Sequence, residues 1–415
     1  MSEEAVEESL AELGRLVTTL GFKVVGQTHQ KQRTTAGATG VGAGKLRELI
    51  QLTDGKIPEA GPVFGASFGA PAAPELANVV VFDCDLKPAQ MRHIESALGV
   101  EVLDRTGVII EIFSRHAKTK AARLQVEIAR LNYLSPRIRE VGSSGERQAG
   151  RGSGESALTI ERSRIRDRLA QLRRELAAVQ RDQGDHRQAR YEQRSVALVG
   201  YTNAGKSSTM RALTGSEVLV EDKLFATLDT TVRALKPETQ PRILVSDTVG
   251  FIKKLPHDLV ASFKSTLDEA LNASLLLYVV DAADPSFRGQ LEVVEEVLKD
   301  VGVKNTPTLL VLNKADQLDD VSKRRLAREF PDAILTSSLV KQDVRNLRDR
   351  IVTFFETDMV DESLFVSYEA KGMVGEIRNN MRVIRETNGD EGITFTVRAR
   401  AAELARFKRK FGIAE

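Results

Sequence analysis

The run GYTNAGKS, from Gly200 to Ser207, constrains this chain more than any other stretch of its sequence. It has the spacing G-x-x-x-x-G-K-[ST], follows the strand-like run SVALV, and leads into STMRAL, which begins a helix. In such a loop, backbone N–H groups surround a phosphate, the lysine neutralises charge, and the hydroxyl ligates Mg²⁺. The sequence therefore predicts a nucleotide-binding α/β domain with Lys206 at the phosphates.

A second glycine-rich run, GATGVGAGK at Gly37–Lys45, does not meet these requirements. Only three residues separate Gly40 from Gly44, and Leu46 supplies no hydroxyl group. We expect a loop ahead of a helix there, and a second nucleotide or an RNA contact in this region stays open.

Five short apolar runs between residues 196 and 356 alternate with helical patterns. Strands that are apolar throughout are typical of parallel sheets covered on both faces. We therefore expect a doubly wound sheet. Its strands are predicted in SVALVG, RILVSDTVG, LLLYVVDAA, TPTLLVLNKAD and AILTSS.

The base is indicated by NKAD, at Asn313–Asp316, which follows the strand-like run TLLVL. A carboxylate at Asp316 can accept hydrogen bonds from both N1–H and the exocyclic amine of guanine, which adenine does not present together. A site built on such bonds discriminates strongly, because the wrong base leaves buried polar atoms unpaired. The sequence predicts GTP and GDP as ligands.

Two further segments complete the predicted GTPase site. In DTVG, Asp247 would hold Mg²⁺ through water and the Gly250 amide would sense the γ-phosphate. In LFATLDTT, Thr227 would join Ser207 as a direct Mg²⁺ ligand, with Thr230 and Thr231 as alternatives. Lys206, Thr227 and Gly250 are the predicted catalytic residues. The predicted nucleotide contacts are Gly200, Tyr201, Thr202, Asn203, Ala204, Gly205, Lys206, Ser207, Ser208, Phe225, Ala226, Thr227, Leu228, Asp229, Asp247, Thr248, Val249, Gly250, Asn313, Lys314, Ala315, Asp316, Ser337, Ser338 and Leu339.

Positive charge is concentrated in one part of the chain. Residues 115–195 contain 19 lysine and arginine residues against 10 aspartate and glutamate residues, although the whole chain has a net charge of only +2. Two helical patterns flank a Gly- and Ser-rich stretch there, and apolar residues of the second recur at coiled-coil spacing. This predicts a basic antiparallel hairpin that meets a polyanion. A solvated helical face is the alternative.

With these motifs in this order, the chain resembles the HflX family of ribosome-associated GTPases. The resemblance is close at GYTNAGKSS, LFATLD, DTVGFIKKLPHDLV and NKAD, and it extends to VLDRTGVIIEIFSRHAKTKAARLQVEIARLNYLSPR and RGSGE. It covers roughly residues 10 to 356. The chain departs from the family pattern at Thr230, where proline is usual, and at Ser337-Ser338-Leu339 in the last motif.

The resemblance implies a partner and a role. Such proteins bind the large ribosomal subunit, and some split stalled or idle ribosomes when GTP is bound. We therefore expect binding to the 50S subunit and the 70S ribosome. The hairpin tip would contact rRNA near the peptidyl transferase centre through Arg147, Arg151, Gly152 and Gly154. Asn203 matches an asparagine that holds K⁺ in some related GTPases; a role in shaping the loop is the alternative.

The domain organisation follows from these patterns. We expect an N-terminal α/β subdomain (1–114), the basic hairpin (115–195), the P-loop G domain (196–356) and a small C-terminal α+β domain (357–415). The runs FKVVGQ and NVVVFD are predicted strands of the first subdomain. The acidic N-terminus, the single cysteine and the shortness of the apolar runs predict a cytoplasmic protein without a membrane span. We also expect a monomer. A GTPase acting on another RNA, or in RNA modification, is the alternative function.

Overall fold

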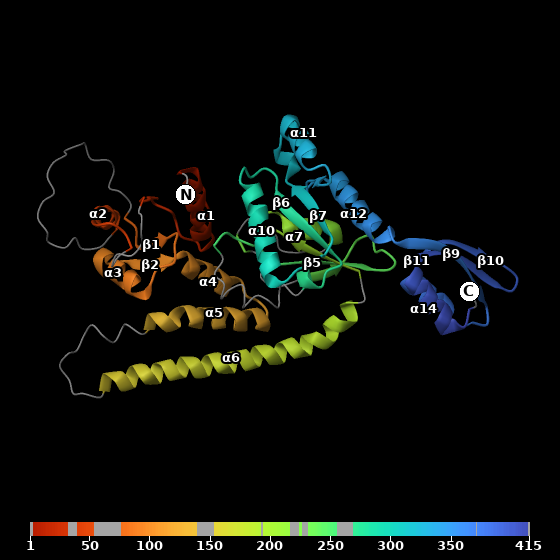
Figure 1. Ribbon diagram of the computed structural model, residues 1–415, viewed down its shortest axis with the longest axis horizontal. Coiled ribbons are helices and arrows are strands. Elements are labelled where there is room, and N and C mark those ends of the chain that lie inside the picture. The colour runs from red at the N-terminus through yellow and green to blue at the C-terminus, as the bar shows by residue number, and fades with distance from the viewer. Residues whose placement is uncertain are drawn as a thin grey trace, which may run out of the picture. The chain divides into compact units, whose positions relative to one another are not determined.

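The apolar runs of the second half of the chain form a sheet in the computed structural model, which describes residues 3–31, 40–53, 76–138, 153–191, 194–215, 224–225, 231–254, 269–370 and 372–413. The strand order is β4-β5-β3-β6-β7-β8, and neighbours are parallel except for the pair β4 and β5 (Figure 1). This confirms the predicted doubly wound sheet. Its strands are β3 (Arg194–Val199), β4 (Thr231–Ala234), β5 (Ile243–Asp247), β6 (Leu275–Asp281), β7 (Thr308–Asn313) and β8 (Ile334–Leu335).

Helices cover both faces of this sheet. Val279 of β6 belongs to a buried cluster with residues of α7 and α12, whereas its neighbour Val280 packs with residues of α10 and α11. Because successive side chains of a strand point to opposite faces, burial of both explains the continuous apolar sequence. The helices and one short 3₁₀ turn are α7 (Lys206–Thr214), α10 (Phe287–Val301), η1 (Ala315–Gln317), α11 (Asp320–Glu329) and α12 (Lys341–Glu356).

The chain divides into two compact units. The first comprises Met1–Gln180, Lys223–Phe225 and Leu255–Phe263. The second comprises Arg181–Asp222, Ala226–Lys254 and Lys264–Glu415, and therefore contains both the sheet above and the C-terminal strands.

The first unit begins with a small α/β motif. Strands β1 (Val79–Phe82) and β2 (Glu101–Asp104) are parallel and are connected by α3 (Pro88–Leu98). The run Phe22–Gln27, expected from its valines to be a strand, has no regular secondary structure, so that expectation was wrong. Val24 and Val25 are 39% and 43% exposed. Because no neighbouring strand pairs with this run, it forms no sheet hydrogen bonds despite its β-branched residues. The remaining helices are α1 (Glu3–Thr19), α2 (Ala43–Leu52), α4 (Arg105–His116), α5 (Lys120–Ile138) and α6 (Ser153–Tyr191).

A buried carboxylate joins β2 to α5 within this unit. Asp104 is fully buried and caps α4 by accepting a hydrogen bond of 2.8 Å from the Gly107 amide. The Tyr133 hydroxyl and the Arg137 guanidinium each donate to the same carboxylate at 2.7 Å. Burial and the Asp104 carboxylate raise the pKa of Tyr133, so the phenol stays a donor. These bonds fix the last turns of α5 against the α/β motif.

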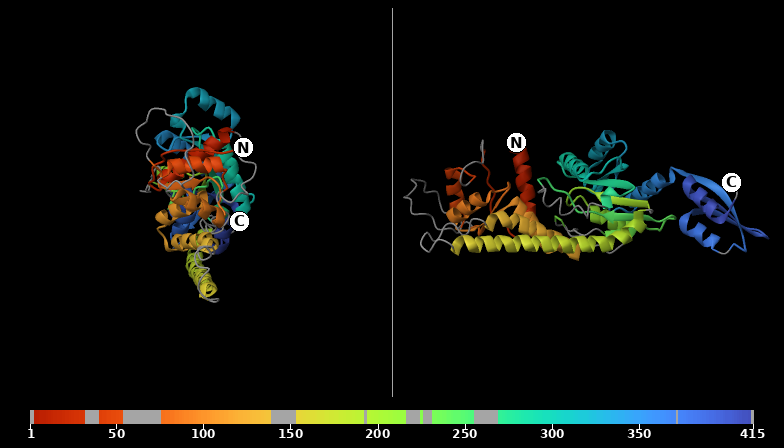
Figure 2. Two further views of the ribbon diagram at one scale, coloured as in Figure 1. Left: turned by 90° about the vertical axis from the view of Figure 1, so that its left-hand side faces the viewer. Right: turned by 60° about the horizontal axis from the view of Figure 1, so that its bottom comes forward.

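Helices α5 and α6 form the predicted hairpin. Leu124 and Ile128 of α5 pack against Leu172 of α6, which is fully buried. Leu169, Leu176 and Val179 of α6 contact the same cluster, which confirms part of the predicted seam. Figures 1 and 2 show the two helices side by side.

The C-terminal strands form a separate three-stranded antiparallel sheet of order β10-β11-β9. One face packs on two helices through a core that includes Phe395 of β11, Ile377 of α13 and Phe407 of α14. The predicted α+β character is confirmed. The elements are β9 (Met359–Ser367), α13 (Met373–Asn380), β10 (Arg382–Asn388), β11 (Gly392–Arg400) and α14 (Ala401–Phe411).

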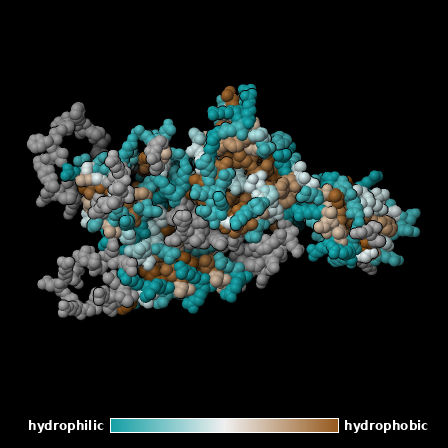
Figure 3. Space-filling view, in the orientation of Figure 1, coloured by the Kyte–Doolittle hydropathy of each residue, from teal (hydrophilic) through white to brown (hydrophobic). Residues whose placement is uncertain are grey.

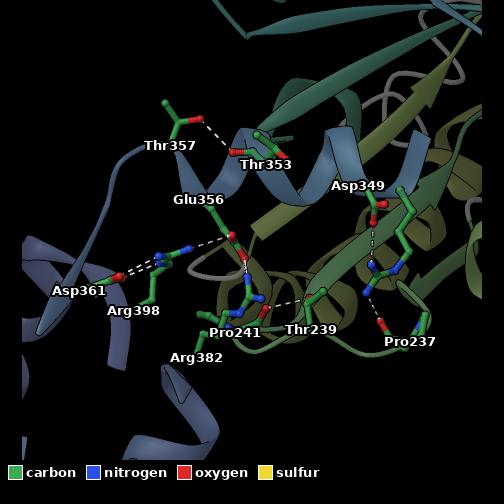
Figure 4. Close-up of polar contacts among 11 residues, drawn as sticks. Pro237, Thr239, Pro241, Asp349, Thr353, Glu356, Thr357, Asp361, Arg382 and Arg398 are labelled. Carbon is green, nitrogen blue, oxygen red and sulfur yellow. Dashed lines mark hydrogen bonds and ion pairs between the residues drawn. The ribbon is translucent and has the colours of Figure 1, made fainter. Parts of the chain in front are cut away.

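An ion-pair cluster lies where α12 continues into β9, as Figure 4 shows. Glu356, the last residue of α12, pairs with Arg382 of β10 and, at 3.7 Å, with Arg398 of β11. Arg398 also forms two hydrogen bonds with Asp361, of 2.5 and 2.7 Å. The Arg398 guanidinium holds the pKa of the Asp361 carboxyl below its usual range.

Candidate functional site

The P-loop lies between β3 and α7, as the sequence predicts. The Lys206 side chain is buried, and its Nζ donates to the carbonyl oxygens of Gly200 at 3.1 Å and Tyr201 at 2.7 Å. Burial lowers the pKa of Lys206 to about 8, although the nearby Asp247 carboxylate acts in the opposite direction. A buried cation with so little countercharge favours an anion in the loop.

Two of the three oxygen donors predicted for Mg²⁺ lie together. The Ser207 hydroxyl donates to Asp247 Oδ2 at 2.7 Å, although the two residues come from the start of α7 and the end of β5. Asp247 is fully buried. A hydroxyl and a carboxylate are the hard oxygen ligands that Mg²⁺ prefers, so the residues present fit this ion.

The segment after β5 is attached to the P-loop by its backbone. The Thr202 amide donates to the Phe251 carbonyl at 2.8 Å, and the Phe251 amide donates to the Gly200 carbonyl at 3.1 Å. The Lys253 amide donates to the Tyr201 hydroxyl at 2.6 Å. Phe251 itself is 2% exposed, so its side chain packs in the interior, where it cannot orient a water molecule.

Gly250, the last residue of the DTVG motif, lies very close to the phosphate loop. A Cβ atom there would come within 2.9 Å of Thr202 Cα and 3.0 Å of Lys206 Nζ. Only glycine permits this approach, which brings the Gly250 backbone to the lysine expected at the phosphates. The predicted γ-phosphate contact of its amide agrees with this position.

The NKAD motif is hydrogen-bonded to the P-loop. Asn313 is fully buried, and its Nδ2 donates to the Ala204 carbonyl at 2.9 Å. Its Oδ1 accepts a hydrogen bond of 3.2 Å from the Ser338 amide. Gly205, at a φ of 92°, lies so close that a Cβ atom would be 2.1 Å from Asn313 Nδ2. Asn313 therefore joins the P-loop to the segment after β8.

The remaining residues of that motif line the expected base site. Lys314 adopts a φ of 59° and pairs with Asp281, at the end of β6, at 2.7 Å. Asp316 lies in η1 and is exposed, so its carboxylate is accessible to a base. The Ser337 amide donates to Asp343 at 2.9 Å, whereas Ser338 is only partly buried.

Several predicted contacts lie outside the described residues. These are Ala226, Thr227, Leu228 and Asp229, together with Arg147, Arg151 and Gly152, and their roles stay predictions. Gly154 lies in the first turn of α6. Phe225 belongs to the first unit, where its ring packs edge to face on Phe113 of α4 with centroids 4.6 Å apart.

Sequence reasoning missed Asp281 and, for the predicted nucleotide contacts Tyr201 and Thr248, the structural bonds of their hydroxyl groups. Asp281 orients Lys314, the Tyr201 hydroxyl accepts from Lys253, and the Thr248 hydroxyl donates to the Leu198 carbonyl at 2.7 Å. Asp281 had a readable signal, because it is a charged residue directly after the apolar run LLLYVV. The other two depend on contacts between segments far apart in sequence.

Family models cover the chain from its N-terminal region through most of the G domain. Residues 7–114 match a model described as GTP-binding GTPase N-terminal, and residues 116–190 match one described as GTP-binding GTPase middle region. Residues 195–314 match a model described as 50S ribosome-binding GTPase.

Whole-chain relatives extend this likeness. The GTPase HflX of Gluconacetobacter diazotrophicus is 54% identical over 422 residues, which cover 98% of this chain and 94% of the relative. The GTPase HflX of Caldanaerobacter subterraneus subsp. tengcongensis is 37% identical, over 94% of this chain and 86% of its own. That of Escherichia coli strain K12 is 44% identical over 60% of each chain.

A solved structure is also similar. A GTP-binding protein from Sulfolobus solfataricus, in complex with GDP, is 26% identical and covers 85% of this chain and 96% of its own, with a TM-score of 0.44. Within the described part of the chain, no helix is long and apolar enough to cross a membrane.

The motifs, their geometry around Lys206 and the whole-chain relatives lead to one conclusion: the chain belongs to the HflX family of GTPases, which bind GTP and hydrolyse it to GDP and phosphate.

Proposed function

We propose that this GTPase acts on the large ribosomal subunit and splits stalled or idle ribosomes while GTP is bound. The model matched by residues 195–314 is named for binding to the 50S subunit, and this supports the choice of partner. In this proposal the protein binds 50S subunits and 70S ribosomes as a monomer in the cytoplasm.

The observation that carries the proposal is the surface of α6. This helix has 39 residues, and its buried contacts run along one stripe that includes Leu172. Arg164, Arg166, Arg173 and Arg174 are exposed on the rest of the helix, and Figure 3 shows hydrophilic residues along it. These arginines are not part of the buried stripe. Exposed arginines spread along one helix are typical of a surface that binds nucleic-acid phosphates.

The tip of the hairpin is the proposed contact with rRNA near the peptidyl transferase centre. Arg147 and Arg151 would pair with phosphates, and Gly152 and Gly154 would allow the backbone to approach RNA closely. Such phosphate contacts release counterions, so binding should weaken steeply as salt rises.

At the nucleotide, Ser207 and Thr227 would ligate Mg²⁺ directly and Asp247 would act through water, while Asn203 is the candidate K⁺ ligand. The ions would neutralise phosphate charge during transfer. The protein's own part is to hold the phosphates with Lys206 and the P-loop amides, and to present Gly250 beside them.

Sedimentation tests the proposal. The wild-type protein should pellet with 50S subunits in the presence of a non-hydrolysable GTP analogue, and should convert 70S particles into subunits on a sucrose gradient. The double variant Arg173→Glu with Arg174→Glu should lose most of this binding at intermediate salt. The matched control is Arg324→Glu with Arg325→Glu on α11, which carries the same change of charge on exposed residues.

Two results would contradict the proposal. Wild-type protein that stays in the supernatant with the analogue would remove the ribosome as partner. Binding that leaves 70S particles intact would remove the splitting role and keep only association.

A further inference from the structure

The C-terminal sheet has one covered and one uncovered face. Strand register places Leu364, Phe395 and Val397 on the face that packs against α13 and α14. Figure 1 shows α14 on one side of these strands. Residues between them in the sequence point the other way. We call that opposite face the outer sheet face; it includes Arg385 and Phe365, which are both exposed.

One end of the outer sheet face is basic. Arg382 and Arg398 are cross-strand partners on β10 and β11, and Arg385 follows on β10 opposite Thr396. Arg385 has no ion-pair partner among the residues that the structure describes. Arg382 and Arg398 both pair with Glu356, and Arg398 also pairs with Asp361. The Arg398 and Asp361 side chains are 36% and 46% exposed, and exposed pairs of this kind contribute little, so a phosphate can compete for the arginine.

The other end of the same face carries an aromatic ring. Phe365 of β9 is 54% exposed and lies opposite Thr394 of β11, which in turn lies opposite Thr387 of β10. The ring lies over Gly392, where a Cβ atom would come within 2.9 Å of Phe365 Cζ. A phenylalanine held against the backbone and still half exposed is a ready stacking platform.

The order of elements supports this reading. The segment runs β9-α13-β10-β11-α14 with strand order β10-β11-β9, the arrangement of a ferredoxin-like unit without its last strand. Single-stranded RNA is commonly read on the open face of such sheets, where bases stack on aromatic side chains and arginines meet phosphates.

We propose that the outer sheet face of the C-terminal domain is a binding site for single-stranded RNA. A base stacks on Phe365, and the phosphates extend toward Arg385, Arg382 and Arg398. Phe365 and the Arg398 row lie four residues apart along β9, about 13 Å. The threonine hydroxyls between them can pair with the ribose 2′-hydroxyl, which distinguishes RNA from DNA.

Charge and shape favour RNA over a protein partner. The exposed side chains of this face include arginines, hydroxyls, one aromatic ring and the carboxylate of Asp361, whereas protein docking surfaces have an apolar centre. The site is separate from the hairpin and does not rest on the proposed ribosomal role.

The chain contains no tryptophan, which gives a direct test. Phe365→Trp places the only tryptophan, which can be excited separately from the five tyrosines, at the proposed stacking position in the full-length protein. Titration with a uridine-rich single-stranded RNA oligonucleotide, without ribosomes, should quench its fluorescence to saturation, less so at higher salt. Adding Arg385→Glu should weaken the apparent affinity at least about fivefold.

Three controls make the outcome decisive. Val321→Trp on α11 places the tryptophan on an exposed site away from the C-terminal sheet and should show no saturable quenching. Arg406→Glu, exposed on α14, should leave quenching of the Phe365→Trp protein unchanged. DNA of the same sequence should quench more weakly. No quenching, equal quenching of both tryptophan variants, or equal quenching by DNA would overturn the assignment.

Discussion

Asn313 donates a hydrogen bond of 2.9 Å to the carbonyl oxygen of Ala204, and this single bond links the predicted base site to the P-loop. The two residues are 109 positions apart in sequence. The asparagine of the NKAD motif therefore acts on the shape of the P-loop and on the segment after β8 at the same time.

Asn313→Ala should weaken GDP binding about tenfold or more. The change leaves the Ala204 carbonyl and the Ser338 amide without their partner, a loss of about 1–3 kcal/mol for buried groups. Titration of labelled GDP measures it, with Asn346→Ala, exposed on α12, as the control. Unchanged affinity would show that the P-loop keeps its shape without this brace.

Asp316→Asn should weaken binding of both GTP and GDP by about 2–3 kcal/mol, the range for a hydrogen bond to a charged group. Asp320→Asn removes the same charge from the exposed start of α11 and should have no effect. The wild type should bind ADP far more weakly than GDP. Equal binding of the two nucleotides would refute the guanine assignment.

Lys206→Met should make the nucleotide-free protein more resistant to unfolding at neutral pH. The pKa of Lys206 is about 8 in the folded protein and 10.5 unfolded. Below pH 8 the folded protein therefore holds a protonated lysine away from water, which costs on the order of 3 kcal/mol of stability. The variant avoids this cost but also loses the hydrogen bonds of the lysine, which offsets part of the gain.

The sign of the pH dependence checks this account. Between about pH 8 and pH 10.5 the unfolded chain binds more protons, so this lysine makes wild-type stability rise with pH. The difference in the free energy of unfolding between Lys206→Met and the wild type, measured with urea, should therefore be smaller at about pH 10 than at about pH 7. GDP should stabilise only the wild type. A constant difference between the proteins would contradict the lowered pKa.

Asn203→Gly tests the proposed K⁺ ligand. Asn203 has a φ of 61°, a conformation that glycine adopts without strain, so the variant removes the amide and keeps the loop. Wild-type turnover should be faster in K⁺ than in Na⁺ at fixed ionic strength, and the variant should lose the difference. Equal wild-type rates in both salts would leave Asn203 with only a loop-shaping role.

Large ribosomal subunits should stimulate GTP hydrolysis at least about tenfold, which corresponds to about 1.4 kcal/mol off the barrier. Many small GTPases orient the attacking water with a glutamine at the position of Phe251. Here that side chain is buried and apolar, so the isolated protein should be slow.

Arg147→Glu with Arg151→Glu should reduce this stimulation and flatten its salt dependence, while GTP affinity stays unchanged. Multiple-turnover hydrolysis with and without 50S particles measures both effects, with the Arg324 and Arg325 reversal as control. Full stimulation of the tip variant would separate the hairpin from activation.

The sheet was largely predictable because its strands are buried on both faces. β3, β5, β6, β7 and β8 each contain a short apolar run, whereas β4 (TVRA) is a short, partly exposed edge strand without such a signal. The opposite error occurred at Val24 and Val25, where local propensity had no partner strand. Whether a strand has a partner depends on the whole fold. A single sequence indicates such pairing only where the paired strands are buried and therefore apolar.

The site divides in the same way. Motif spacing predicted Lys206, Ser207 and Asp247 as one group, because phosphate and metal binding require those residue types in that order, and the structure places the three close together. The Lys314–Asp281 pair was not predictable, since it depends on β6 and β7 being neighbours. Phe225 packing on Phe113 was also missed, because nothing in the sequence assigns that residue to the first unit.

Gly205 and Gly250 both lie too close to other atoms to carry a side chain, but they differ in which atoms a Cβ would meet. That difference decides whether a second substitution could relieve the clash. The clash of a Cβ atom at Gly205 is with the Asn313 side chain, so a smaller residue at 313 could relieve it, although the φ of 92° would still oppose any other residue. The clash at Gly250 is partly with Thr202 Cα, a backbone atom that no second substitution removes. A smaller residue at 313 would therefore remove the clash at Gly205 but also the hydrogen bond to Ala204, while no change of a neighbouring side chain removes the backbone clash at Gly250.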